Sequence, residues 1–333
     1  YVNAAIGLAL LFVVSVALHS RMYQLRPAPD RLTGFYLAMS VGGVLGGVFA
    51  GLLAPIVFDW TYEYPLLILA AGALVPQMFL MPATARLWRG EGQRYRIKVL
   101  SAALAVLILV WLGIANPADM LGDMHEQIAF LAVAGVGLAA VGARVPFVIA
   151  LAGGLFLFGG YRAVQMSLSD ARTRSYFGVY SVSEDAQERR LAHGTTLHGI
   201  QLTGTRSRLP TTYYVPGSGV GQAMEALPRL YGPAARVGVV GLGTGTLACY
   251  AQPGQAWRFY EIDPAVVRIA RDSGTFSFLR QCLPGAEIAI GDARLRLGEA
   301  PAGSLDLLAL DAFSSDAVLM HLMTAEAFDT YAR

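Results

Sequence analysis

Glycine and threonine alternate directly after an apolar run in the second half of the chain. Residues 237–240 are rich in valine, and Gly241, Gly243, Thr244 and Gly245 follow them. Glycines after a strand let the backbone approach a bound nucleotide closely, and a helical pattern comes next. The turn lacks the full GxGxxG phosphate-binding fingerprint, so by itself it is weak evidence for a nucleotide site.

Three acidic residues strengthen this interpretation because each follows a predicted strand. Glu261 ends the second strand, Asp292 lies in the Gly-Asp-Ala turn after the third, and Asp311 follows the fourth. Strands that alternate with helices indicate a parallel, doubly wound sheet. Ligands of such sheets bind at the carboxyl ends of the strands. The combined spacing therefore predicts an S-adenosylmethionine-type site.

The chemistry of that ligand assigns a role to each residue. Glu261 would accept hydrogen bonds from the ribose diol, and Asp292 with the Ala293 amide would hold the adenine edge. The glycine turn would face the methionine-derived part. Asp311 would lie beside the sulfonium, where a carboxylate can bind a protonated amine and take its proton.

Structural roles compete with these functional ones. Asp263 precedes Pro264, which is a helix-capping pattern. Glu261 could be a solvated strand end, Asp292 a turn residue, and Asp311 a cap of the next helix. The same alternatives apply to four further candidates: a capping role for Asp316, β-packing for Tyr213 and Tyr214, and a plain strand position for Gln201. We expect His321, within an apolar run, to be a packed histidine.

The elements upstream of this site are mostly apolar. Charged residues make up 14% of the chain and the mean hydropathy is +0.50, whereas soluble domains carry about a quarter charged residues. We predict a transmembrane helical domain over residues 1–165, with about six spans. The predicted spans are residues 3–18, 35–58, 64–79, 99–114, 128–141 and 146–161.

Charged loops predict which side of the membrane each loop faces. The loops after the first and third spans are basic, and those after the second and fourth are acidic, so the odd-numbered loops should be cytoplasmic. Six crossings would then place the rest of the chain outside, although Arg162, Arg172 and Arg174 make that segment basic too. Either the last two runs do not both cross, or the soluble half faces out. We favour the cytoplasmic side because an adenosyl cofactor is made there.

Glycines in the second span predict close packing between helices rather than a transport path. Small residues at this spacing let helix backbones approach in lipid, and a transport path is not expected without intramembrane charge. The residues concerned are Gly42, Gly43, Gly46, Gly47 and Gly51.

The soluble half should contain two parts. Residues 166–215 alternate and are rich in Thr, Tyr and Val, which predicts a small antiparallel β-unit. Residues 216–333 predict a Rossmann-like, class I methyltransferase-type domain. Such a sheet normally has more strands after Asp311, so we expect the C-terminal strands to be missing and the chain to be a piece of a longer protein.

Several functional classes are disfavoured. A net charge of +2 gives no nucleic-acid footprint. The two cysteines, Cys249 and Cys282, predict neither a disulfide framework nor a zinc site. The five histidines are scattered through the sequence, so we expect no metal.

Several segments resemble the spermidine/spermine synthase superfamily. They are VGVVGLGTGT (237–246), FYEIDPAVV (259–267), IGDAR (290–294) and LDLLALDAFSSDAVLMHLMTAEAF (305–328). The chain is more closely similar to bacterial membrane-fused spermidine-synthase-like proteins, through LTGFYLAMSVGG (32–43) and EYP (63–65). This implies a small β-domain on a Rossmann-like sheet in an integral inner-membrane protein. It also implies aminopropyl transfer from decarboxylated S-adenosylmethionine to a small amine, releasing methylthioadenosine. Asp311 matches the catalytic aspartate, Glu261 the ribose binder, and Gln201 lies near the substrate-side glutamine.

The sequence departs from the family pattern in three places. The aspartate of the glycine turn is replaced by Thr244, which removes discrimination against intact S-adenosylmethionine. The acidic run that binds the diamine is replaced by residues 208–214, in which only Tyr213 and Tyr214 retain its character. The DSSDP loop becomes residues 311–316, with Asp311 and Asp316 as its acids.

Three hypotheses follow. The first is an integral-membrane aminopropyltransferase. The second is an enzyme that uses intact S-adenosylmethionine, for methylation (releasing S-adenosylhomocysteine) or for transfer or elimination of its aminocarboxypropyl group. The third is a membrane sensor or transporter that binds a nucleoside or polyamine. The expected partners are the lipid bilayer and a small amine, with a homo-oligomer left open.

Overall fold

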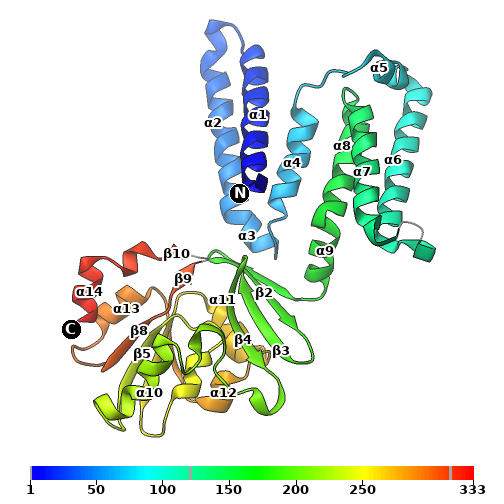
Figure 1. Cartoon of the computed structure of the whole chain (residues 1–333). Helices are drawn as coiled ribbons and strands as arrows, with labels where there is room; N and C mark the ends of the chain where they lie inside the picture. Colours follow the sequence, from blue (N-terminus) through cyan, green and yellow to red (C-terminus); the bar gives the residue numbers. More distant parts are fainter. Residues whose placement is uncertain (1, 120–121, 315–316) are drawn as a thin grey trace. The chain divides into compact units, whose positions relative to one another are not determined.

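The computed structural model describes residues 2–119, 122–314 and 317–333, which form two compact units, Tyr1–Leu168 and Ser169–Arg333. The first unit is entirely helical (Figure 1). Its α-helices are α1 (Val2–Gln24), α2 (Leu32–Val48), α3 (Ala54–Val57), α4 (Glu63–Leu74), α5 (Pro82–Trp88), α6 (Gly92–Ala115), α7 (His125–Ala140), α8 (Arg144–Leu155) and α9 (Tyr161–Leu168). Single wide turns, η2 (Phe49–Leu53) and η5 (Phe156–Gly160), join α2 to α3 and α8 to α9.

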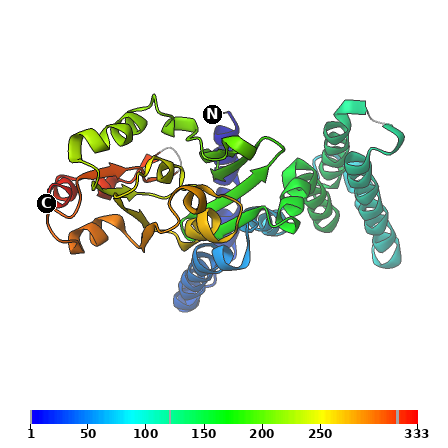
Figure 2. The same cartoon turned by 90° about the horizontal axis from the view of Figure 1, so that it is seen from below.

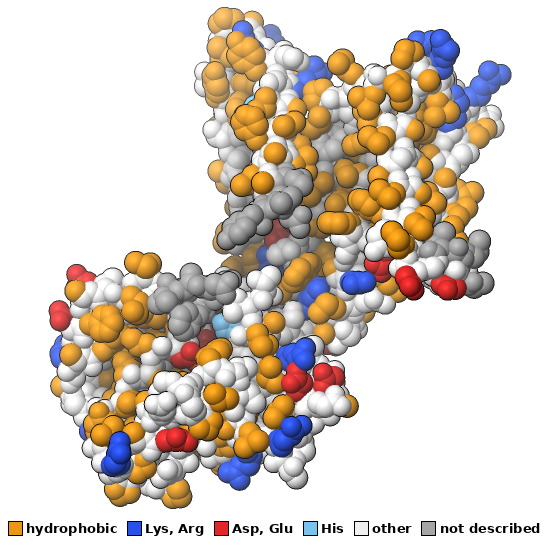
Figure 3. All heavy atoms as spheres, in the orientation of Figure 1, with side chains coloured by type: hydrophobic (Ala, Val, Ile, Leu, Met, Phe, Trp, Pro, Cys, Tyr) orange, Lys and Arg blue, Asp and Glu red, His pale blue; other side chains and the backbone are white. Residues whose placement is uncertain are grey.

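Four segments of this unit are long and apolar enough to cross a membrane. They are Gly7–Gln24, Pro29–Val57, Gly92–Ala115 and Arg144–Leu168, whereas α4 is a shorter apolar helix of 12 residues. Figure 3 shows hydrophobic side chains along these helices, basic ones at the end where α5 meets α6, and acidic ones at the opposite end of α6. Of the six predicted spans, therefore, four have the length that a bilayer requires.

The helices α6, α7 and α8 lie side by side in both views (Figures 1 and 2). A Cβ atom on Gly153 would lie 2.5 Å from a methyl of Val106, and one on Gly113 would lie 2.6 Å from the Ala129 methyl. Glycine is therefore required at both contacts. The close packing predicted for the glycines of the second span is not seen among the described residues. A Cβ at Gly42, Gly43, Gly46 or Gly47 of α2, or at Gly51 of η2, would meet no described atom within 4 Å.

The second unit contains two main sheets. The first is antiparallel, in the order β1-β2-β3-β4, and forms the predicted β-unit. The second is parallel, in the order β7-β6-β5-β8. The strands are β1 (Arg172–Ser175), β2 (Gly178–Glu184), β3 (Glu188–His193), β4 (Thr196–Leu202), β5 (Arg236–Val240), β6 (Ala256–Glu261), β7 (Glu287–Ile290) and β8 (Leu307–Leu310); a short pair, β9 (Phe313–Ser314) and β10 (Ala317–Val318), follows.

Short helices connect and cover these strands. The α-helices are α10 (Gly219–Tyr231), α11 (Pro264–Val267), α12 (Phe278–Cys282), α13 (Ala293–Glu299) and α14 (Ala325–Tyr331), and the 3-10 turns that matter for the site are η7 (Thr212–Tyr214), η8 (Thr246–Tyr250) and η10 (Met320–Leu322). The helix predicted after Gly245 is thus only a short 3-10 turn. Asp263 caps α11 by accepting from the Ala265 amide, as its position before Pro264 predicts.

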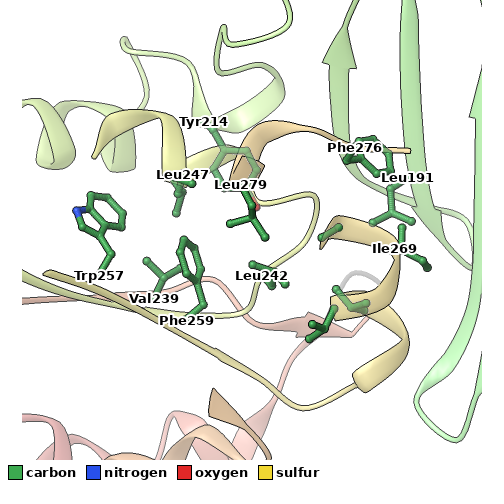
Figure 4. Packing of buried hydrophobic residues seen from close by; sticks show 14 of the residues in the cluster. Leu191, Tyr214, Val239, Leu242, Leu247, Trp257, Phe259, Ile269, Phe276 and Leu279 are labelled. Carbon is green, nitrogen blue, oxygen red and sulfur yellow. The ribbon is translucent and has the colours of Figure 1, made fainter. Parts of the chain in front are cut away.

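One apolar core joins the β-unit to the parallel sheet. Leu191 of β3, Val239 of β5 and Phe259 of β6 belong to the same buried cluster (Figure 4). A Cβ atom on Gly199 of β4 would lie 2.5 Å from the Thr244 hydroxyl, so β4 packs directly on the glycine turn. Because the two parts share a core, the boundary predicted at residue 215 does not separate two independent bodies.

The sequence predicted no disulfide framework, yet the two cysteines are paired. Cys249 of η8 and Cys282 of α12 form a disulfide, with their Cα atoms 4.8 Å apart. They are 33 residues apart in sequence, and neither belongs to a recognisable spacing pattern, so the sequence alone did not indicate the pairing. The bond ties the segment after the glycine turn to α12.

Candidate functional site

The predicted site residues gather at the carboxyl edge of the parallel sheet. The glycine turn follows β5, Glu261 ends β6, Asp292 follows β7 and Asp311 follows β8, and all pairings among these strands are parallel. Chain order reverses between β5 and β8, which is the position where open α/β sheets bind ligands.

A cavity of about 300 Å³ opens at this edge. Its floor comes from the ends of β5, β6 and β8, and its other wall comes from the β-unit. The residues that line it are Phe177, Tyr180, Leu191, His193, His198, Tyr214, Gly241, Leu242, Gly243, Glu261, Ile262, Val266, Asp311, Ala312, Leu319 and His321.

A smaller cavity of about 40 Å³ continues from the first and shares Gly241, Glu261, Ile262, Ala312, Leu319 and His321 with it. Asp292 and Ala293 line this extension. The predicted ribose and adenine residues therefore border one continuous space, with Glu261 at the junction of its two parts.

Asp311 lies at the base of the larger cavity. Its carboxylate accepts a hydrogen bond from the Tyr214 hydroxyl, and burial raises the pKa of this carboxyl to about 6, against the opposing effect of that hydrogen bond. The hydroxyl of Tyr213 lies 3.3 Å from that of Tyr214. Burial and the nearby Asp311 charge hold the pKa of Tyr214 well above its usual value, so this phenol remains a hydrogen-bond donor.

Glu261 is almost fully buried, with 7% of its surface exposed. Its two carboxylate oxygens accept from the amides of Leu242 and Asp263, each at 3.0 Å. Burial raises the pKa of this carboxyl while the amide hydrogen bonds lower it. Each oxygen retains a further lone pair, so the carboxylate can still accept a hydrogen bond from a bound diol.

Backbone conformation explains why glycine is needed in the turn. Gly241, Gly243 and Gly245 all have positive φ, at 96°, 53° and 82°. A Cβ on Gly241 would collide with the backbone carbonyl oxygen of Asp311. The glycine turn and the predicted catalytic residue are thus in direct contact, which a residue with a side chain would prevent.

Two predicted binding residues do not line the cavity. Thr244 is 1% exposed, and its hydroxyl lies 2.9 Å from that of Thr246. Gln201 is also 1% exposed; its amide nitrogen donates to the Ser277 hydroxyl and to the carbonyl oxygen of Ser207, and its oxygen accepts from the Ser277 amide. Both side chains therefore help to hold the β-unit against the parallel sheet, and the hydrogen bonds of Gln201 give it a structural role.

The remaining predictions have mixed outcomes. Gly245 contributes to the turn but its Cβ position faces Leu279, and Tyr213 lies behind Tyr214 rather than in the lining. Asp316 lies outside the described residues. The prediction that His321 is a packed histidine is wrong. Its side chain is 45% exposed, and its Nε2 lies 3.0 Å from Asp292 Oδ2.

Sequence reasoning missed a group of aromatic and imidazole side chains in the cavity. Tyr180, His193, His198 and His321 line it, so three of the five histidines of the chain meet here. His198 and Gln201 are three positions apart on β4. Because side chains alternate along a strand, the prediction that put Gln201 in the site implied that His198 lies on the opposite face.

Comparisons of the sequence with protein-family models and with curated proteins give no match. Among the described residues, no group of three or more histidine, cysteine or acidic side chains could hold a metal ion.

Proposed function

We propose that the second unit is a Rossmann-like, S-adenosyl-nucleoside-binding transferase attached to a membrane domain. Counted along the chain, the parallel strands have the order 3-2-1-4, which matches the first four strands of the dinucleotide-binding order 3-2-1-4-5-6. We propose as its reaction the transfer of an aminopropyl group from decarboxylated S-adenosylmethionine to a small amine, with release of methylthioadenosine.

The observation that carries this proposal is the position of Asp311. A carboxylate with a pKa near 6 lies in a cavity beside the glycine turn, with a phenol fixed against it. A base of this kind is mostly ionised at neutral pH and can still accept a proton. Burying a carboxylate costs stability, so its position in the cavity favours a role toward a bound ligand.

The residues present fit the proposed nucleoside. Glu261 would accept from the ribose hydroxyls, and the Ala293 amide with Asp292 would contact the adenine edge. Gly241 tolerates no Cβ beside the Asp311 backbone, so the glycine turn lies directly against that residue. When bound, the nucleoside would supply a sulfonium whose adjacent methylene carbon is electrophilic.

The protein's part in the transfer is to hold and deprotonate the amine. Asp311 would bind the ammonium form, take one proton and release a lone pair for attack on that carbon. A nitrogen–carbon bond forms, the carbon–sulfur bond breaks, and sulfur keeps the bonding electrons. Tyr214 would keep the ionised carboxylate aimed at the amine. The remaining positive charge ends as a protonated product amine, so the step requires no oxidant or metal.

Intact S-adenosylmethionine is the second candidate cofactor. Thr244 replaces the family's acidic residue in the turn, and its side chain packs against Gly199 of β4 instead of the cavity. The turn therefore offers no carboxylate that would repel the carboxylate of the intact cofactor. Methyl transfer or aminocarboxypropyl transfer at the same site would follow.

We place the catalytic unit on the cytoplasmic side of the bacterial inner membrane. The segment after Tyr161 carries Arg162, Arg172 and Arg174, and is thus basic like the loops after the first and third predicted spans. An adenosyl cofactor is made in the cytoplasm, so this side also gives the proposed site access to its ligand.

The test uses the full chain purified in detergent micelles. It is incubated with either cofactor and with a mixture of 1,4-diaminobutane and primary monoamines, and the products are identified by mass spectrometry. Methylthioadenosine together with an aminopropylated amine supports the proposal. S-adenosylhomocysteine would replace it with methylation. Absence of both turnover and cofactor binding would remove both enzyme readings.

A further inference from the structure

The helical unit contains a cavity of its own, of about 510 Å³, where α8 passes into α9 (Figure 1). One side of this cavity comes from the start of α7, and the other comes from η5 and the start of α9. All of these elements belong to the first unit. The cavity is therefore separate from the glycine turn and its neighbours in the second unit.

The helix is interrupted where it borders this cavity. Phe158 has a ψ of 48° and Gly159 has a φ of 99°, so both residues depart from helical geometry. A Cβ at Gly159 would meet no described atom within 4 Å, so the backbone here borders open space. The break lies inside Arg144–Leu168, one of the segments that could cross a membrane. Membrane helices break where the freed backbone is covered by protein or lines a cavity, so this break indicates a place for a polar ligand group.

An ion pair forms the polar side of the cavity. Nη2 of Arg162 lies 3.2 Å and 3.3 Å from the two carboxylate oxygens of Glu126, and the two side chains are 72% and 40% exposed. Charges this exposed would be costly in hydrocarbon, so we place the pair at the level of the lipid headgroups. A guanidinium carries five N–H donors and suits phosphate well. Arg162 can therefore hold Glu126 and a phosphate together.

The rest of the lining is mostly apolar. The rings of Phe130 and Phe158 lie 5.6 Å apart, and Leu131 and Leu157 line the cavity beside them. Phe158 and Leu131 are 78% and 67% exposed, so alkyl chains placed here would gain burial. The cavity thus combines an apolar surface with an adjacent pair of opposite charges.

We propose that this cavity binds a bilayer phospholipid whose headgroup carries a primary ammonium beside its phosphate. The phosphate would accept hydrogen bonds from Arg162, and the ammonium would donate to Glu126. The acyl chains would lie against Phe130, Leu131 and Phe158. The opposite charges of the headgroup match those of the ion pair, whereas a headgroup of net negative charge would bring a second anion toward Glu126. This inference is independent of the proposed transferase function.

The N–H donors of the headgroup decide its preference. A choline headgroup carries the same positive charge but has no N–H group, so it cannot donate to Glu126. Its methyl groups could contact the rings of Phe130 and Phe158, but a cation–π contact at an exposed site is weaker than a charge-assisted hydrogen bond. We therefore expect the primary ammonium to bind about 5-fold to 10-fold more tightly than choline.

Lipids that differ only in N-methylation provide the test. They are phosphatidylethanolamine, its N-methyl and N,N-dimethyl derivatives, and phosphatidylcholine, all with palmitoyl and oleoyl chains. The full chain purified in detergent is titrated with each lipid, and native mass spectrometry gives the Kd of the first bound lipid. Affinity should fall as N–H donors are lost, by about 5-fold to 10-fold over the series. Equal affinity across the series, or tighter binding of phosphatidylglycerol with the same chains, would overturn the proposal.

Variants of the ion pair locate the site. Glu126→Gln and Arg162→Gln should each reduce the preference for phosphatidylethanolamine over phosphatidylcholine to about 2-fold or less, because each removes one charged partner. Arg144→Gln, at an exposed position where α8 begins, removes the same charge far from the cavity and should leave the preference unchanged. A preference that survives in both ion-pair variants would show that the lipid binds elsewhere and would overturn the assignment. The methylation series uses the wild type, so it decides the question even if a variant fails to fold.

Discussion

The Tyr214 hydroxyl donates to the Asp311 carboxylate across 97 residues of sequence. One partner belongs to η7, which follows the β-unit, and the other follows the last strand of the parallel sheet. The contact therefore exists only when both parts of the second unit are in place. It fixes the orientation of the Asp311 carboxylate, and the prediction for Tyr214→Phe depends on it.

Replacing Asp311 by Asn should abolish turnover while leaving cofactor binding nearly intact. Asn cannot take a proton, and loss of a general base costs about 10²–10⁴ in rate. Single-turnover rates report the chemical step, and isothermal titration reports cofactor affinity. Asp272→Asn, at an exposed position paired with Arg271, is the matched control. Turnover that persists in Asp311→Asn would show that another group is the base.

The same substitution should raise stability above pH 6. The pKa of Asp311 is raised from 3.8 to about 6 on folding, so the folded state binds more protons between these pH values. Its contribution to stability is therefore greatest below about pH 4 and declines as pH rises to about 6. Asn removes the buried charge, and we expect a gain on the order of 1–3 kcal/mol at pH 7, measured by urea denaturation at pH 4 and 7. A gain equal at both pH values would contradict this cause.

Tyr214→Phe should move the pH–rate profile. In the wild type, kcat/KM should rise with pH through about 6, as Asp311 ionises. The Tyr214 hydrogen bond favours the ionised carboxylate, so its loss should shift this rise upward by about one pH unit. Tyr213→Phe, one hydroxyl further away, should shift it less. A profile unchanged in Tyr214→Phe would mean that the observed titration is not that of Asp311.

His321→Ala should tighten nucleoside binding at neutral pH. His321 Nε2 occupies the Asp292 oxygen that an adenine amino group would need, and removing this competitor should increase affinity about 3-fold to 10-fold. Equilibrium binding of the cofactor, and of adenosine alone, measures the effect. Weaker binding of adenosine would instead assign His321 a direct contact with the base.

The Cys249–Cys282 disulfide provides a stability test and a test of membrane side. Closing a segment of this length stabilises a domain by about 3–4 kcal/mol in the chain-entropy account, so the Cys282→Ser variant should melt earlier than the oxidised wild type. Disulfides are uncommon in a reducing cytosol. If the second unit faces the cytoplasm, as we propose, this pair should be reduced in intact cells and should form its disulfide only on oxidation. Alkylation after rapid acid quenching detects the free thiols. A fully oxidised pair before lysis would contradict the cytoplasmic placement.

The sequence was most informative where rules of chain geometry apply. Apolar runs followed by glycines or acids located the ends of β5 through β8. Parallel strands bring their carboxyl ends to one edge, so these residues gather there. Glu261, Asp292 and Asp311 therefore border connected cavities, as predicted. Their roles in binding and catalysis stay predictions until a ligand is tested.

The cavity wall formed by the β-unit could not be predicted from the sequence in the same way. The register of β3 and β4 shifts between Leu191 and Ala192, and such an irregularity changes which side chains face the cavity without altering the sequence pattern. His193 follows this shift. Gln201 was placed by resemblance, and the structure instead gives its polar atoms to Ser207 and Ser277. The pairing of Cys249 with Cys282 likewise depends on tertiary packing.

The contact between Gly199 and Thr244 has a consequence for synthesis. Within the second unit the β-unit leaves the ribosome first, with its apolar face uncovered until the glycine turn has been made. The central strand β5 then precedes both neighbours, β6 and β8, so the sheet must grow outward from its middle. Asp311 is added after all four strands, so the nascent chain lacks this carboxylate until the parallel sheet has been translated.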